Sequence, residues 1–141
     1  MDIAVVGSGG WGTALSMLLH ENRHEVTLIS YSKEESDNLA KTLENPFLPG
    51  VKLPEDMRYT ADPAAVAGCT MVVVVPPSFA IRSTAERIAP HLRPDAIPLI
   101  FFSLSPTHIL FTCEIFTCMM SRPVFLAIWS ALSVFPVPGS P

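Results

Sequence analysis

The fold is decided by the sequence DIAVVGSGGWG at residues 2–12, in which a short apolar run leads directly into a glycine-rich turn. Residues 13–19 carry apolar side chains at helical spacing, and a second strand-like run covers residues 25–30. This order predicts a strand, a glycine turn, a helix and a second strand. Gly7, Gly9 and Gly12 then match the pattern G-x-G-x-x-G in the one context where that pattern is informative.

Each of these glycines has a physical role in binding a dinucleotide. Gly7 permits the tight turn, Gly9 leaves the backbone open to a pyrophosphate, and Gly12 lets the helix pack closely against the strand. The helix that begins near Gly10 offers free N–H groups and its positive dipole end to the phosphates. The alternative is a glycine-rich turn without a ligand, and the flanking strands argue against it. We therefore expect an α/β fold, a Rossmann-type doubly wound parallel sheet.

Composition limits the classes of protein that this sequence can represent. Its 141 residues suffice for one domain with a substantial core. A net charge of −4 gives no indication of a nucleic-acid surface. Strand-forming residues begin at Ile3 without the pattern of a signal peptide, and the three cysteines lack zinc-ligand spacing. We expect a cytoplasmic protein with free thiols, no metal site and no nucleic-acid partner.

The end of the second strand bears on the choice between NAD and NADP. NAD-selective folds of this type place an acidic residue there to bind the ribose 2′-OH, and this sequence has none at that point. Tyr31 is instead surrounded by small or basic residues. Ser30, Ser32 and Lys33 can donate to a 2′-phosphate, which favours NADP or the use of both cofactors. Ser32 is also interpreted as the N-cap of a helix, in a capping box with Glu35, and the two interpretations are compatible.

Further elements continue the alternation of helices and strands. Leu15, Leu18 and Leu19 are expected on the buried face of the first helix. Residues 70–75 form an apolar run without alternation, as in a strand buried on both faces of a parallel sheet. In order, the sequence predicts helices at residues 10–21, 33–44, 63–68 and 79–89, and strands at residues 58–60, 70–75 and 97–103.

A second part of the cofactor site is expected directly after residues 70–75. Loops at the carboxyl ends of parallel strands line the ligand crevice, which places Pro77 and Phe79 near the cofactor. Phe79 is interpreted either as a wall for the cofactor or as a core residue. Ser78 is expected to cap the helix that follows.

The character of the chain changes near residue 97. Only Glu114 and Arg122 among the charged residues lie beyond Asp95, and six prolines interrupt residues 97–141. A membrane segment is one interpretation, but no uninterrupted apolar span of about 20 residues is present. The other is a truncated Rossmann domain at residues 1–103, followed by an irregular apolar tail at residues 104–141 that is out of frame or disordered.

Four segments carry a more specific signal. They read IAVVGSGGWGTAL at residues 3–15, HEVTL at 24–28, ENPFLPGVKLP at 44–54, and VVPPS at 74–78 with Arg82. The tryptophan inside the glycine motif and the loop at residues 44–54 distinguish one family among Rossmann proteins. Up to about residue 100 the chain resembles the N-terminal cofactor domain of NAD(P)-dependent glycerol-3-phosphate dehydrogenase of the bacterial type, whereas the tail does not match.

This resemblance implies a reaction, namely hydride transfer between NAD(P)H and dihydroxyacetone phosphate, which gives sn-glycerol 3-phosphate for phospholipid synthesis. It also implies a cytosolic enzyme that is usually a homodimer. The family's cofactor positions correspond to Gly10, Trp11, Tyr31 and Ser32 of this chain. Many members have Arg or His where Tyr31 stands.

The chain departs from the family at the residues that carry catalysis. The family continues into a Lys-Gly-Ile-Glu segment whose lysine contacts substrate and cofactor, whereas residues 104–107 here read LSPT. A second catalytic lysine belongs to a helical C-terminal domain that we do not expect here, and the last lysine is Lys52. Without a cation to polarise the carbonyl, hydride transfer loses its main electrostatic stabilisation. We expect the cofactor-binding portion of a dehydrogenase, without catalytic residues; a non-catalytic dinucleotide-binding module or subunit is the alternative.

Overall fold

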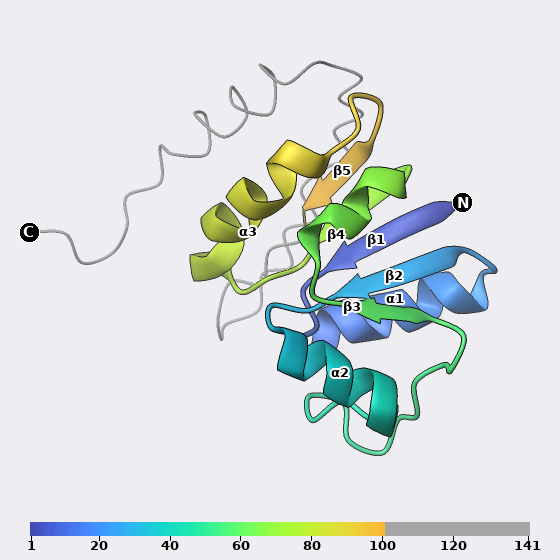
Figure 1. The fold of residues 1–141 in the computed structure, drawn as a ribbon. Helices are drawn as coiled ribbons and strands as arrows, with labels where there is room; N and C mark the ends of the chain where they lie inside the picture. Colours follow the sequence, from blue (N-terminus) through green and yellow to red (C-terminus); the bar gives the residue numbers. More distant parts are fainter. Residues whose placement is uncertain (101–141) are drawn as a thin grey trace, which may run out of the picture.

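The computed structural model describes residues 1–100, apart from the side chain of Ser78. A parallel five-stranded sheet in the order β3-β2-β1-β4-β5 forms its centre (Figure 1). The strands are β1 (Asp2–Val6), β2 (Glu25–Ile29), β3 (Arg58–Thr60), β4 (Met71–Val74) and β5 (Ile97–Ile100). The α-helices are α1 (Gly10–Glu21), α2 (Lys33–Thr42) and α3 (Ile81–Ile88), and the 3₁₀ helices are η1 (Pro63–Gly68), η2 (Ser78–Ala80) and η3 (Ala89–His91). This is the predicted α/β Rossmann-type arrangement.

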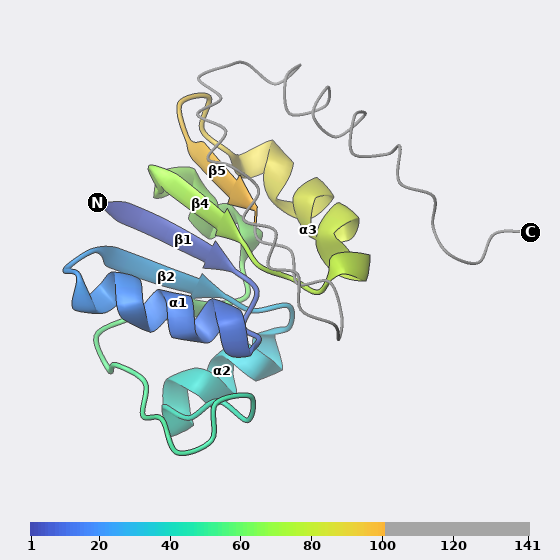
Figure 2. The ribbon, with the colours of Figure 1, turned by 180° about the vertical axis from the view of Figure 1, so that it is seen from behind.

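Both faces of the sheet are covered, because the central strands carry apolar side chains in both directions. Ile3 and Val5 belong to the core on the side of α1 and α2. Ala4 and Val6 belong to the second core, on the side of η1 and α3. Figures 1 and 2 show α1 and α2 on one face and α3 on the other. The prediction of a doubly wound sheet is therefore confirmed for residues 1–100.

The register brings three loops to the same edge of the sheet. Strand β1 pairs with β2 up to Val6 opposite Ile29, and with β4 up to Val6 opposite Val74. The three strands are parallel, so their carboxyl ends lie level with one another. The chain leaving each strand must then turn at this edge, which is where the predicted site residues are found.

The buried face of α1 differs from the expectation. Its buried residues are Gly12, Thr13 and Ser16, whereas Leu18 is 55% exposed and was wrongly predicted to face the core. The helix lies so close to the sheet that only small side chains fit between them. Leu15 and Leu19 are partly buried at the margins of this contact and pack against the core.

Two helices also end or begin away from their predicted positions. Helix α2 stops at Thr42 because Leu43 adopts a left-handed conformation, with φ of 53°, and its N–H donates to the carbonyl of Leu39. The predicted helix at residues 79–89 is divided into η2, α3 and η3. Residue Ser78 is already inside η2, whose N-cap is Pro77, so the predicted cap at Ser78 is wrong. At η1 the Asp62 carboxylate accepts from the N–H of Ala64 at 2.9 Å and so caps the start of this helix.

Some predictions fall on residues outside the described range. These are the last residues of the strand at 97–103, the tail at 104–141, and two of the cysteines. Cys69 is a buried free thiol. Burial is the main cause that raises the pKa of this thiol, and the negative charge of Asp2 raises it further. None of the helices found in residues 1–100 has the length and apolar character that a membrane span requires.

Candidate functional site

A cavity of about 460 Å³ opens at the carboxyl ends of β1, β2 and β4. Three turns form its floor, at residues 6–9, 29–31 and 75–77. Side chains of α2 and α3 form opposite walls, including Glu35 and Arg87, and Phe47 reaches it from the loop after α2. In an open parallel sheet this crevice is the expected ligand site, at the point where the strand order reverses.

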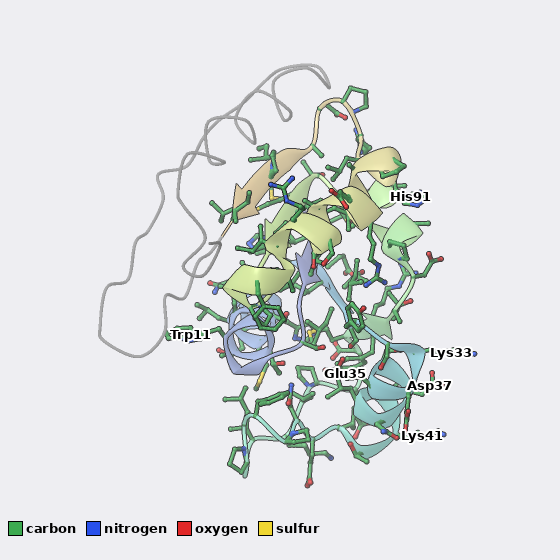
Figure 3. All side chains as sticks on the ribbon, turned by 90° about the vertical axis from the view of Figure 1, so that its left-hand side faces the viewer. Trp11, Lys33, Glu35, Asp37, Lys41 and His91 are labelled. Atoms are coloured by element: carbon green, nitrogen blue, oxygen red, sulfur yellow. The ribbon has the colours of Figure 1, made fainter. Side chains whose placement is uncertain are left out.

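The cavity gathers part of the predicted set of cofactor residues. The members that line it are Gly7, Gly9, Tyr31, Pro77 and Phe79. The remaining predicted residues are not among those lining it, namely Gly10, Trp11, Gly12, Ser32 and Lys33. In Figure 3, Trp11 and Lys33 point outward from opposite sides of the molecule. Phe79 is 89% exposed, which rules out the interpretation of this side chain as a core residue.

The glycine turn has two closed positions and one open position. At Gly7, φ is +121°, and an added Cβ would lie 2.7 Å from the carbonyl oxygen of Val75. At Gly12, an added Cβ would overlap the carbonyl oxygen of Gly7. At Gly9, an added Cβ would meet no atom within 4 Å. Packing therefore requires glycine at positions 7 and 12, whereas Gly9 faces open space at the start of α1.

The N-terminus of α1 is suited to an anion. Its N-cap is Gly9, which makes no side-chain capping hydrogen bond, and its first turn contains no acidic residue. Free N–H groups at a helix start carry a partial positive charge. Together with the open space at Gly9, they form a site with the polarity that a pyrophosphate needs.

Asn45 holds the glycine turn in place from a distant part of the chain. Its side-chain NH₂ donates to the carbonyl of Ser8 at 2.9 Å and to the hydroxyl of Thr13 at 2.6 Å. Its side-chain oxygen accepts from the N–H of Phe47 at 2.9 Å. The Asn45 side chain is buried, so each of these polar groups depends on the others for its hydrogen bonds.

Replacing Asn45 with alanine is expected to lower the free energy of unfolding by about 1–3 kcal/mol, because buried partners lose their hydrogen bonds. Urea denaturation followed by circular dichroism measures the loss. Asn38→Ala is the matched control, since Asn38 is an exposed asparagine on α2. An equal effect of the two substitutions would show that Asn45 does not hold the turn.

The capping box predicted at the start of α2 is half formed. The Ser32 hydroxyl accepts from the N–H of Glu35 at 3.2 Å, as predicted. The Glu35 carboxylate does not return to Ser32; it accepts from the Ser8 hydroxyl at 2.7 Å. Figure 3 shows Glu35 directed inward from α2, whereas Lys33 is directed away. Glu35 thus joins α2 to the glycine turn and brings a negative charge to the cavity wall.

Several residues of this site were not identified from the sequence. Glu35 was considered only as a capping residue, and Asn45 only as part of a characteristic loop. Arg87 carries no local signal, since its position at the cavity depends on how α3 packs across the sheet. Phe47 follows the same pattern, because the loop after α2 must fold back over the glycine turn before this ring reaches the cavity.

Comparison with known proteins identifies sequences similar to this chain. The family described as "NAD-dependent glycerol-3-phosphate dehydrogenase N-terminus" matches residues 2–104. The glycerol-3-phosphate dehydrogenase [NAD(P)+] of Shouchella clausii is 40% identical over 103 residues, which are 72% of this chain and 30% of that protein. The corresponding protein of Xanthomonas euvesicatoria is 46% identical over 94 residues, covering 65% and 27% of the two chains.

A solved structure of a glycerol-3-phosphate dehydrogenase has a similar fold. Glycerol-3-phosphate dehydrogenase from Coxiella burnetii superposes with a TM-score of 0.67 at 30% sequence identity, covering 72% of this chain and 32% of that one. The chain therefore spans about 30% of the length of the curated relatives that it matches.

Proposed function

This chain belongs to the family of NAD-dependent glycerol-3-phosphate dehydrogenases through its N-terminal domain, and on that premise we propose that it binds a nicotinamide dinucleotide in the cavity at the carboxyl ends of β1, β2 and β4. The family consists of NAD(P)-dependent oxidoreductases. Of the predicted cofactor residues, those proposed to contact the dinucleotide inside the cavity are Gly7, Gly9, Tyr31, Pro77 and Phe79. The others are proposed to contact it where it extends beyond the cavity, namely Gly10, Trp11, Gly12, Ser32 and Lys33. We propose residues 1–103 as the domain and residues 104–141 as a tail outside it.

The observation that carries this proposal is the contrast between the glycines. Gly7 and Gly12 have no room for a side chain, but Gly9 faces a space that no protein atom fills within 4 Å of an added Cβ. Gly68 is equally open but lies away from the cavity, whereas Gly9 lines the cavity. An open position before a helix N-terminus suits a ligand phosphate that must approach the backbone closely. The residues present therefore fit a dinucleotide.

We propose that different residues contact different parts of the bound dinucleotide. The N–H groups at the start of α1 hold the pyrophosphate, and Phe79 and Pro77 cover the nicotinamide side of the cavity. When bound, the dinucleotide supplies or accepts a hydride. NADP is the proposed preference over NAD, because Ser30 and its neighbours can donate to a 2′-phosphate and the sequence lacks an acidic residue directly at the end of β2.

The whole reaction, reduction of dihydroxyacetone phosphate to sn-glycerol 3-phosphate in the cytoplasm by a homodimer, is proposed only for an intact enzyme that contains this domain. Residues 53–141 contain no lysine, and residues 104–107 read LSPT where the family has a lysine to polarise the substrate carbonyl. This feature favours a chain that binds cofactor without turning substrate over. It equally suits a non-catalytic dinucleotide-binding module or subunit.

A rate assay tests this proposal. The purified chain with NADPH and dihydroxyacetone phosphate is expected to show no oxidation of NADPH above the rate without protein. A full-length glycerol-3-phosphate dehydrogenase serves as the positive control. Steady oxidation that depends on both the chain and dihydroxyacetone phosphate would overturn the predicted lack of catalysis.

A further inference from the structure

Arg87 of α3 and Tyr31 at the end of β2 meet across the cavity. The guanidinium carbon of Arg87 lies 5.1 Å from the centroid of the Tyr31 ring, and both residues line the cavity. This cation–π contact joins elements from the two walls of the crevice. Arg87 is half-buried, and none of the ion pairs found within residues 1–100 involves it. Its charge is therefore oriented toward the cavity without an acidic partner there.

Ser30 provides an independent sign of a missing ligand atom. Its hydroxyl is the one buried side-chain oxygen or nitrogen, among residues 1–100, that has no hydrogen-bond partner. The residue is 2% exposed and lines the same cavity, next in sequence to Tyr31. A buried hydroxyl without a partner is costly, and a ligand bound in the cavity would supply the missing acceptor.

We propose that Arg87 and Ser30 bind the 2′-phosphate of NADPH, so that Arg87 determines the choice between NADP and NAD. This assignment rests on the proposed binding of a nicotinamide dinucleotide. A guanidinium presents several N–H donors in one plane and suits a phosphate, and the Tyr31 ring holds that plane at the cavity. The Ser30 hydroxyl donates to another oxygen of the same phosphate. The adenosine ribose then lies at the end of β2, where this fold binds it.

Glu35 is the other charged residue that lines the described cavity, and its negative charge repels a phosphate. Its carboxylate accepts from the Ser8 hydroxyl, which ties it to the glycine turn rather than to Arg87. The 2′-phosphate is therefore directed to the α3 wall, away from Glu35. Removing this carboxylate charge in Glu35→Gln is expected to tighten binding of NADPH by a few-fold and to change binding of NADH less.

The experiment compares dinucleotide binding to the full chain and its variants by calorimetric titration with NADPH and NADH. Arg87→Gln is expected to raise the dissociation constant for NADPH at least tenfold and to leave that for NADH within about twofold. Arg87→Lys keeps the charge but loses the planar donor set, so it should fall between Arg87→Gln and the wild type. Arg82→Gln is the control, since Arg82 lies on the same helix and does not line the cavity.

A second pair of probes isolates the adenosine end of the cofactor. Adenosine 2′,5′-bisphosphate should compete better than AMP for the wild-type site, and Arg87→Gln should abolish that difference. If Arg87→Gln weakened the binding of NADPH and NADH equally, or did not weaken the binding of NADPH, the assignment of Arg87 would be wrong. The proposed binding of a dinucleotide would still stand. A wild-type chain that binds neither dinucleotide would overturn the proposed function and this assignment with it.

Discussion

Gly12→Ala is expected to destabilise the domain more than any other methyl-sized substitution in the glycine turn. An added Cβ would overlap the carbonyl oxygen of Gly7, which is backbone and cannot rotate away. Helix α1 would have to move off β1, and the core that contains Ile3 and Val5 would open. Overpacking of this kind costs about 3 kcal/mol or more, a large fraction of the stability of a small domain.

Urea denaturation followed by circular dichroism measures this effect. Gly68→Ala is the control, because Gly68 has no atom within 4 Å of an added Cβ and no positive φ. The control is expected to unfold within about 0.5 kcal/mol of the wild type. If Gly12→Ala matched the control, α1 would not pack against the turn as closely as the structure shows.

Gly9→Val is expected to weaken the binding of the dinucleotide while the chain remains folded, in contrast to Gly12→Ala. The position has an extended backbone, with φ of −66° and ψ of 178°, which valine adopts readily, and it has free space around an added Cβ. Valine is a poorer N-cap than glycine, so we expect a loss of stability of about 1 kcal/mol or less. Its side chain would fill the space where the pyrophosphate is proposed to lie.

The expected result is a dissociation constant for NADPH and for NADH about a hundredfold above that of the wild type, equivalent to roughly 2.7 kcal/mol. Titration calorimetry measures binding, and thermal unfolding verifies that the variant is folded. Gly68→Val is the matched control, since it places the same side chain at an open position away from the cavity. Unchanged binding by Gly9→Val would place the pyrophosphate somewhere other than the glycine turn.

Local patterns in the sequence were sufficient to predict the sheet and the glycine turn. The run at residues 2–6 and the glycines that follow it predict a strand, a turn and the start of a helix, because each residue type fits its own backbone position. The same local reasoning failed for Leu18. The buried face of α1 is set by how closely the helix approaches β1, and that distance depends on Gly12 rather than on the hydrophobic periodicity of the helix.

The rest of the site depends on contacts between residues far apart in the sequence. Asn45 reaches the glycine turn from the loop after α2, and Arg87 reaches Tyr31 from the opposite face of the sheet. The segment at residues 44–54 marks Asn45 as part of a characteristic loop but does not show which atoms Asn45 contacts, and Arg87 lies in no recognisable motif. The unpartnered hydroxyl of Ser30 could be recognised only after every neighbouring donor and acceptor had been placed.

The most direct test of this account is a calorimetric titration of the intact wild-type chain with NADPH and, separately, with NADH. The account predicts saturable binding of at least one of them at a single site per chain, with a dissociation constant below about 1 mM. Absence of binding of both at roughly millimolar concentration, by a chain shown to be folded, would contradict the central claim that the glycine turn is a functional dinucleotide site.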